Sequence, residues 1–267
     1  MTTFRWNFEE DLSQAAALGF TAIGLWRQKL ADYGEQAGQA LLAAMGLSVS
    51  NVCWAGGFIG SDGRSLAESI ADATDAIRLT AALHADCLVV YSGPRGGHTN
   101  THAHRLFRDS LRELLPAARR FGVTLAIKAV HAHCAVDCGI VTRLSDAVDL
   151  IRSFDDPCVK LAFDTYQMGW DLDVPDRLAE LANDIAIVHL ADGHPPTHGE
   201  MHCCPLGQGD VPVEAMLAAL ERGGYNGYFD LKLVGAANDP AGYRDLLVHS
   251  QQSAADMLSA LPSGSQR

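Results

Sequence analysis

The feature that most constrains the fold is an alternation of short apolar segments with longer amphipathic ones. Eight segments have the apolar, β-branched composition of buried strands, and stretches with helical periodicity separate them. The strand candidates are 3–8, 21–26, 47–54, 86–92, 123–129, 158–164, 185–191 and 228–234. This alternation predicts parallel strands joined by right-handed crossovers, and eight strands in about 260 residues favour a closed barrel over an open sheet.

The expected architecture is therefore a single α/β domain, a (β/α)8 TIM barrel. Helical patterns include 65–85, segments within 101–121 and the last helix at about 240–260. No linker, low-complexity segment or internal repeat divides the 267 residues. We predict that the domain covers 1–260 and that 261–267 form a C-terminal tail.

Composition excludes several classes of partner. No apolar run approaches the roughly 18 to 20 residues that a membrane span requires, so we expect no membrane partner. The first residues, MTTFRWNFEEDLSQ, lack a basic stretch followed by an apolar one, and the expected location is the cytoplasm. A net charge of −12 disfavours nucleic acid as a partner. The seven cysteines include no C-x-x-C pair and are expected to be reduced thiols.

Four ionisable residues lie near the same end of four consecutive predicted strands. They are Lys128 in LAIKAV, Asp164 in KLAFD, His189 in IAIVHLAD and Lys232 in YFDLKLV. A barrel places its active site at the carboxyl ends of its strands, and alternation then points these side chains into one mouth. They are the candidate catalytic residues.

The same segments resemble the xylose-isomerase-like TIM barrels, a superfamily that includes ketose 3-epimerases, hydroxypyruvate isomerase, inosose dehydratase and endonuclease IV. The resemblance covers nearly the whole chain. It is clearest in GFTAIGLWRQKL, in LAIKAVHAH, which is similar to L-x-I-E-x-x-H, and in FDTYQMGWD, which is similar to D-T-x-H. It continues in VHLADG, similar to H-x-x-D, and in LGQGDVPVEAMLAALERGGYNGYFDLKL, similar to G-x-G-x-I/V followed by G-Y-x-G-x-x-x-x-E.

The resemblance implies a metal site that this sequence has altered. In the metal-dependent members, a Glu, an Asp, a His and a second Glu hold one divalent ion, and the two Glu also move protons on opposite faces of the substrate. The matching positions here are Lys128, Asp164, His189 and Lys232, so both glutamates are replaced. The histidine of D-T-x-H is Gln167, and an arginine often found in the family falls at His202.

Two lysines change what this set of side chains can bind. The family's four ligands carry about −3 in charge, which suits a hard divalent cation, whereas this set carries about +1 when both amines are protonated. An ammonium has no lone pair and repels a cation. We therefore expect no metal and no other cofactor.

Three roles for the lysines remain open from the sequence. As ammoniums they could bind a carboxylate or stabilise an enolate oxygen. As neutral amines one could remove a C–H proton while the other returns it. One amine with a lowered pKa could also form a Schiff base.

The leading hypothesis is a metal-independent isomerase or epimerase that removes a proton next to a carbonyl of a small carbonyl or polyhydroxy substrate. The alternatives are a metal-free lyase, by β-elimination or Schiff base, and a non-catalytic ligand-binding barrel in which Asp164 merely bridges two lysines. Barrels of this kind often form dimers, so a homodimer is the oligomer to test.

Six further residues are candidates for substrate binding. His131 matches the family's histidine after the fifth predicted strand, and Trp54 and Trp170 lie in loops on the presumed functional face, where packing is an equal alternative. The full set is Gln167, His131, His202, Trp54, Trp170 and Arg27. A displaced metal site is the other open alternative, because histidines cluster at His98, His102 and His104, at His131 and His133, and at His194, His198 and His202.

Overall fold

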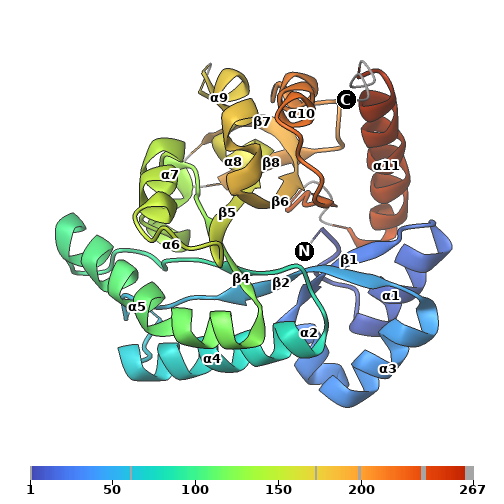
Figure 1. Ribbon diagram of the computed structural model, residues 1–267. Coiled ribbons are helices and arrows are strands. Elements are labelled where there is room, and N and C mark those ends of the chain that lie inside the picture. The colour runs from blue at the N-terminus through green and yellow to red at the C-terminus, as the bar shows by residue number, and fades with distance from the viewer. Residues whose placement is uncertain (1, 61, 172, 198–199, 236–238, 262–267) are drawn as a thin grey trace.

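Seven parallel strands form the centre of the molecule and curve into a nearly closed barrel (Figure 1). The computed structural model describes residues 2–60, 62–171, 173–197, 200–235 and 239–261. The strands, in their spatial order, are β1 (Ala22–Trp26), β2 (Ser48–Ala55), β3 (Cys87–Val90), β4 (Thr124–Lys128), β5 (Val159–Asp164), β6 (Ile185–Leu190) and β9 (Phe229–Leu231). The predicted α/β barrel is confirmed, and seven of the eight predicted strands correspond to these elements.

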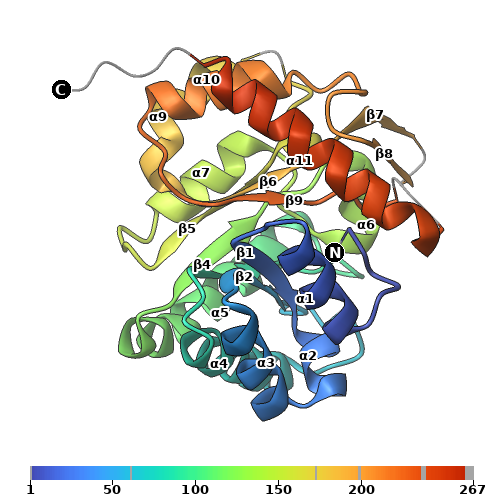
Figure 2. The same ribbon diagram turned by 90° about the vertical axis from the view of Figure 1, so that its right-hand side faces the viewer.

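Helices cover the outside of the barrel in two groups. The first group comprises α1 (Phe8–Ala17), α2 (Arg27–Tyr33), α3 (Glu35–Met45), α4 (Leu66–Ala82) and α5 (Asn100–Phe121). The second comprises α7 (Leu144–Arg152), α9 (Val174–Leu181), α10 (Val213–Arg222) and α11 (Tyr243–Ser259), while the short helices α6 (Ala135–Cys138) and α8 (Thr165–Met168) lie in the segments that follow the carboxyl ends of β4 and β5. In both views α1 to α5 lie against one half of the barrel and α7 and α9 to α11 against the other half (Figures 1 and 2). The predicted helices at 65–85, within 101–121 and at about 240–260 correspond to α4, α5 and α11.

The predicted strand at 3–8 is wrong. Residues 3–5 form a turn, and Phe8 begins α1. Asn7 caps this helix by accepting a hydrogen bond from the backbone N–H of Glu10 at 2.8 Å. Acidic residues in the first turn also stabilise the helix, because their negative charge lies at the positive end of the helix dipole. The aromatic side chains that suggested a strand instead pack on the last helix, since the Trp6 ring lies 5.3 Å from that of Tyr243.

The amino-terminal segment contacts β9 without joining the ladder. The Thr2 hydroxyl donates to the carbonyl of Leu231 at 2.9 Å and accepts from the backbone N–H of Leu233 at 3.0 Å. Within the described residues β1 and β9 make no ladder hydrogen bonds with each other, which leaves the barrel open at this one seam.

An antiparallel hairpin follows β6, in a segment for which no strand was predicted. Its strands are β7 (Asp192–Thr197) and β8 (Glu200–Cys204), with His194 opposite His202. The Tyr166 hydroxyl fixes the hairpin, because it donates to the carbonyl of His194 and accepts from the backbone N–H of His202, both at 2.9 Å. The hairpin therefore rests on the mouth of the barrel beside α8.

The interior is filled by aliphatic side chains of alternate strand positions, as in a packed barrel. Val89, Ala126, Ala162 and Ile187 lie on the same strand faces as Lys128, Asp164 and His189 and are fully buried in the interior. No helix in the described ranges is long and apolar enough to cross a membrane. Of the predicted tail, only Leu261 falls within the described residues.

Candidate active site

The four predicted ionisable residues meet at the carboxyl ends of neighbouring strands. Lys128 is the last residue of β4 and Asp164 the last of β5, while His189 is paired with Asp164 across the β5–β6 ladder. Lys232 follows β9, and its backbone N–H still donates to the carbonyl of Leu190 on β6 at 2.8 Å. Because side chains alternate along a strand, this register turns all four into the barrel.

Asp164 is the centre of the cluster. Its Oδ2 accepts hydrogen bonds from Lys128 Nζ at 2.6 Å and from Lys232 Nζ at 3.3 Å. Its Oδ1 accepts from the backbone N–H of Gln167 at 2.9 Å, which makes Asp164 the N-cap of α8. The carboxylate is thus held by the turn that follows its strand as well as by two amines.

Lys128 has a second acceptor and Lys232 a second contact. Lys128 Nζ lies 2.8 Å from His189 Nδ1, and Lys232 Nζ donates to the Tyr91 hydroxyl at 3.2 Å. The Lys128 side chain has no exposed surface, whereas that of Lys232 is 11% exposed. The two lysines share one carboxylate but have different second partners.

Burial and neighbouring charges move the pKa values of the two lysines in opposite directions. Burial, assisted by the charge of Lys232, lowers the pKa of Lys128 to about 7 against the opposing effect of Asp164. Burial also opposes the charge of Lys232, but Tyr91 and Asp164 outweigh it and its pKa is raised well above the ordinary value. Near neutral pH, Lys128 is therefore partly protonated and partly neutral, while Lys232 stays cationic.

The two remaining groups hold fixed protonation states. Burial raises the pKa of Asp164, but the two lysines outweigh it, so its pKa is lowered and it stays ionised. Burial and then the charges of Lys128 and Lys232 lower the pKa of His189 well below its ordinary value. His189 is therefore neutral, and its Nδ1 is free to accept from Lys128.

A cavity of about 370 Å3 opens over this cluster. Four predicted site residues line it: Lys128, Lys232, Gln167 and Trp54. The other lining residues are Gly56, Gly57, Asp62, Arg64, Tyr91, Gly93, Pro94, Val130, Cys138, Met201 and Val234. Two amines and an amide at the base of a mostly apolar wall form a pocket suited to a small polar ligand.

A hydrogen bond between Gln167 and His131 connects the segment after β5 to the segment after β4. The side-chain Oε1 of Gln167 accepts from the backbone N–H of His131 at 2.6 Å, and its Nε2 lies 3.0 Å from Met201 Sδ. His131 Nδ1 accepts from the backbone N–H of His133 at 3.2 Å. His131 and His189 are not among the residues that line the cavity, and neither are His202, Trp170 and Arg27.

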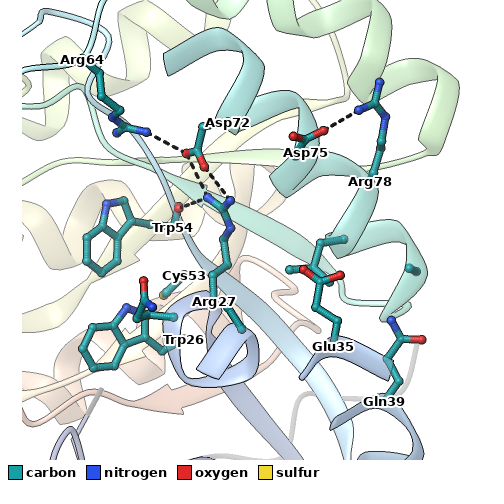
Figure 3. Close-up of a pocket in the computed structure, with 14 residues that line it drawn as sticks. Trp26, Arg27, Glu35, Gln39, Cys53, Trp54, Arg64, Asp72, Asp75 and Arg78 are labelled. Atoms are coloured by element: carbon teal, nitrogen blue, oxygen red, sulfur yellow. Dashed lines mark hydrogen bonds and ion pairs between the residues drawn. The ribbon is translucent and has the colours of Figure 1, made fainter. Parts of the chain in front are cut away.

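Arg27 lies in a second, larger cavity of about 690 Å3 between α2 and α4 (Figure 3). Its guanidinium donates to both oxygens of Asp72, at 2.8 and 3.2 Å, and to the carbonyl of Trp54 at 3.0 Å. Arg64 reaches the same Asp72 carboxylate at 3.1 Å, and the Trp26 and Trp54 rings lie nearly parallel with centroids 6.3 Å apart. Trp54 and Arg64 line both cavities.

Two residues of the site were missed in the sequence. Tyr91 is the penultimate residue of the predicted strand 86–92, and its position after β3 on the carboxyl side could have indicated it. Asp230 lies two residues before Lys232 on β9, so strand alternation already put both side chains on the same face. Both pair with residues far away in the chain, which is why composition alone gave no signal.

The family's divalent ion does not fit these side chains. Lys128 Nζ lies within hydrogen-bond distance of both Asp164 and His189, the two ligand-type side chains that remain. An amine there takes the lone pairs that a cation would need. Among the described residues no three His, Cys, Asp or Glu side chains are grouped so that they could hold a metal ion, and His198 lies outside those residues.

Comparison with known proteins agrees with the fold. Residues 12–252 match the family model for xylose isomerase-like TIM barrels. A crystal structure of a protein from Sinorhizobium meliloti 1021 superposes with a TM-score of 0.87 at 26% identity and covers 96% of both chains. The IOLI protein, solved with a zinc atom, superposes with a TM-score of 0.82 over 98% of this chain and 97% of its own, at 19% identity, which supports the fold alone.

A curated relative gives a shorter match. The L-ribulose-5-phosphate 3-epimerase UlaE of Escherichia coli O1:K1 is 31% identical over 144 residues, which are 53% of this chain and 48% of the relative. The chain thus spans about half the length of the curated relatives it matches. The family model covers most of the chain, so the chain belongs to the xylose isomerase-like TIM barrel family.

Proposed function

We propose that this protein is a metal-independent isomerase or epimerase that removes a proton next to the carbonyl of a small polyhydroxy ketone. The observation that carries the proposal is that two buried lysines share Asp164, while the pKa of Lys128 is lowered to about 7 and that of Lys232 is raised. One amine is thereby suited to act as a base and the other as a fixed cation.

Lys128 is the proposed base. A neutral amine has two N–H groups and one lone pair, and Lys128 has two acceptors in the cluster, Asp164 Oδ2 and His189 Nδ1. Its lone pair is then available to a C–H bond in the cavity. The amine takes the proton, and the electrons of the C–H bond move to the carbonyl oxygen to give an enediolate.

Lys232 is the proposed stabiliser of that enediolate. Its charge lies in the same cavity and is held by Asp164 and Tyr91. Fixed positive charge in a site of low polarity favours the oxyanion more than the neutral ketone, which is the role that the ion has in metal-dependent relatives. Return of the proton by Lys128 to the neighbouring carbon, with transfer of the hydroxyl proton from one enediolate oxygen to the other, gives isomerisation. Protonation of the original carbon by water from the opposite face, with release of the proton on Lys128 to solvent, gives epimerisation.

The cavity and the relatives indicate the class of substrate. A volume of about 370 Å3 suits a small sugar. A relative that matches half of this chain is named an L-ribulose-5-phosphate 3-epimerase, so five-carbon ketoses and their 5-phosphates are the first compounds to test. Gln167 and Trp54 line the cavity beside the amines and are the proposed contacts for hydroxyl groups and carbon faces.

An amine with a pKa of about 7 also favours a second candidate function, Schiff-base or lyase chemistry at Lys128. Attack of the neutral amine on the carbonyl carbon would expel water and give a covalent imine. Borohydride with substrate distinguishes the two: a stable adduct on Lys128, seen as a mass increase, supports the Schiff base, and an unmodified protein that still turns over supports the base.

The proposal is tested by proton exchange in D2O. Purified protein is incubated with each ketose, with and without a chelator, and NMR follows deuterium at the carbon next to the carbonyl, while elemental analysis measures bound metal. We expect exchange that survives the chelator in protein without stoichiometric metal. Exchange that disappears with the chelator contradicts metal independence, and absence of exchange from every ketose favours a non-catalytic ligand-binding barrel.

Assembly and location are also proposals. We expect a homodimer in the cytoplasm. Sedimentation of the purified protein tests the first, and fractionation of the source cells tests the second.

A further inference from the structure

A second acidic side chain lies deeper in the barrel beside His189. Asp230 is on β9, opposite His189 in the β6–β9 ladder, and its Oδ2 lies 3.9 Å from His189 Nε2. The Asp230 side chain is 22% exposed, and it borders a cavity of about 100 Å3 beside the seam between β1 and β9. The proposed reaction assigns this carboxyl no role.

His189 has an N–H group that lacks a partner. When Lys128 Nζ, 2.8 Å away, donates to Nδ1, a neutral imidazole carries its single proton on the other nitrogen, so Nε2 bears the hydrogen. That atom is buried and makes no hydrogen bond with any described residue. Buried donors are nearly always satisfied, and Asp230 Oδ2 is the carboxyl oxygen that faces this one.

Three strands contribute to the place that Asp230 occupies. Asn51 Nδ2, on β2, donates to Asp230 Oδ2 at 2.6 Å, and the Cys53 thiol donates to Asn51 Oδ1 at 3.2 Å, which fixes the orientation of the amide. On β1, Gly24 leaves the necessary space, because a Cβ there would come within 2.2 Å of Asp230 Oδ2. Asn51 and Gly24 therefore determine the position of the Asp230 carboxyl, which faces His189 Nε2.

We propose that Asp230 is a positioning residue that keeps His189 in the tautomer with the proton on Nε2. The opposite tautomer would direct Nδ1–H at Lys128, where it would donate into the amine's lone pair. Lys128 would then lose both an acceptor and the electron pair with which it acts as a base. A carboxyl oxygen facing Nε2 favours the productive tautomer, much as the buried carboxylate does in a catalytic triad.

The kinetic part of this inference rests on the proposed function, but the tautomer does not. The readout is therefore NMR of protein labelled with 15N in histidine, in which protonated and unprotonated ring nitrogens are distinguished. His189 is assigned by comparison with a His189→Gln variant. In the wild type we expect a protonated Nε2 and an unprotonated Nδ1.

Two matched variants separate an acceptor from mere space filling. Asp230→Asn keeps a carbonyl oxygen that can accept from Nε2–H, and we expect the wild-type tautomer. Asp230→Leu fills similar space without an acceptor, and we expect the Nδ1-protonated form to become populated. If turnover is found, kcat of the leucine variant should fall about 10- to 100-fold with KM nearly unchanged.

A third variant keeps the acid and moves it. Gly24→Ala places a methyl group against Asp230 Oδ2 and should change the His189 signals as Asp230→Leu does. Unchanged His189 signals in both variants would overturn the inference, whether or not the protein turns over a ketose. Altered signals in a protein that exchanges no ketose proton would support the inference and contradict the proposed function instead.

Discussion

Two places in this molecule share one arrangement, in which a carboxylate bridges two cations at the wall of a cavity. In the outer cavity Asp72 binds Arg27 and Arg64, and in the inner one Asp164 binds Lys128 and Lys232. The outer cavity is the larger, at about 690 Å3 against about 370 Å3. Size therefore does not identify the reactive one.

The difference lies in burial and in the kind of cation. The side chain of Asp72 is 35% exposed and that of Asp164 is 3% exposed. Arginine keeps its proton at any pH that a protein tolerates, so the outer group is a fixed set of charges. Lysine in a dry site can lose its proton, and the inner group therefore contains one amine that titrates near neutrality. The same ion-pair geometry is therefore structural where neither cation can lose its proton and chemical where one of them can.

The largest effect is expected when Lys128 of the inner group is replaced by arginine, the kind of cation found in the outer group. Lys128→Arg keeps the charge beside Asp164 but removes the base, so ketose proton exchange should fall about 1000-fold. Lys128→Met is the matched variant without charge and should lose as much. Circular dichroism and thermal unfolding check that both variants fold. An arginine variant with more than a tenth of wild-type exchange would show that Lys128 is not the base.

The second effect concerns the cation that does not titrate. Lys232→Met removes the charge that stabilises the enediolate, and we expect kcat to fall about 100-fold. Lys232→Arg keeps the charge and should retain activity within about tenfold. If arginine at 232 is as damaging as methionine, then the lysine proton itself is needed and the division of roles is wrong.

The third prediction is a pH profile. Lys128 acts only when neutral, and its pKa is about 7, so kcat/KM should fall about tenfold per pH unit below pH 7 and level off above it. His189 adds no second limb in this range, since its pKa is well below the ordinary value. Rates measured from pH 5.5 to 9 test this. A flat profile across pH 7 would mean that no group of this pKa controls the reaction.

The smallest effect is expected at the outer group. Asp72→Asn breaks ion pairs that are partly exposed and screened by water, so unfolding free energy should fall by about 1 kcal/mol or less. Exchange activity should stay within about twofold. Chemical denaturation and the D2O assay measure the two quantities. A loss of activity comparable with that of Lys232→Met would place the outer cavity in the reaction.

The sequence predicted the four ionisable residues of the inner group better than it predicted the substrate-binding residues around them. Strand alternation and the carboxyl-end rule correctly brought Lys128, Asp164, His189 and Lys232 together, because both depend on local periodicity. Arg27 was predicted beside them, but its guanidinium is held by Asp72, a residue of α4. The direction of a side chain at the start of a helix depends on partners that periodicity does not reveal.

The same limit explains the error at 3–8. Aromatic residues there satisfy a strand pattern, yet Asn7 starts a helix and the rings pack on α11, more than 200 positions along the chain. The barrel itself was unaffected, since the other strands carry stronger signals. Where local signals compete, a distant contact decides between them.

By itself the sequence determined the barrel class and the four residues at its mouth, since a period of two residues fixes which side chains enter the interior. Only the tertiary structure decided which lysine can lose its proton. That distinction depends on the 2.6 and 2.8 Å contacts of Lys128, on the Tyr91 partner of Lys232 and on the depth at which each amine is buried. A pKa is set by solvent access and by charges in space, and neither is written in the order of residues.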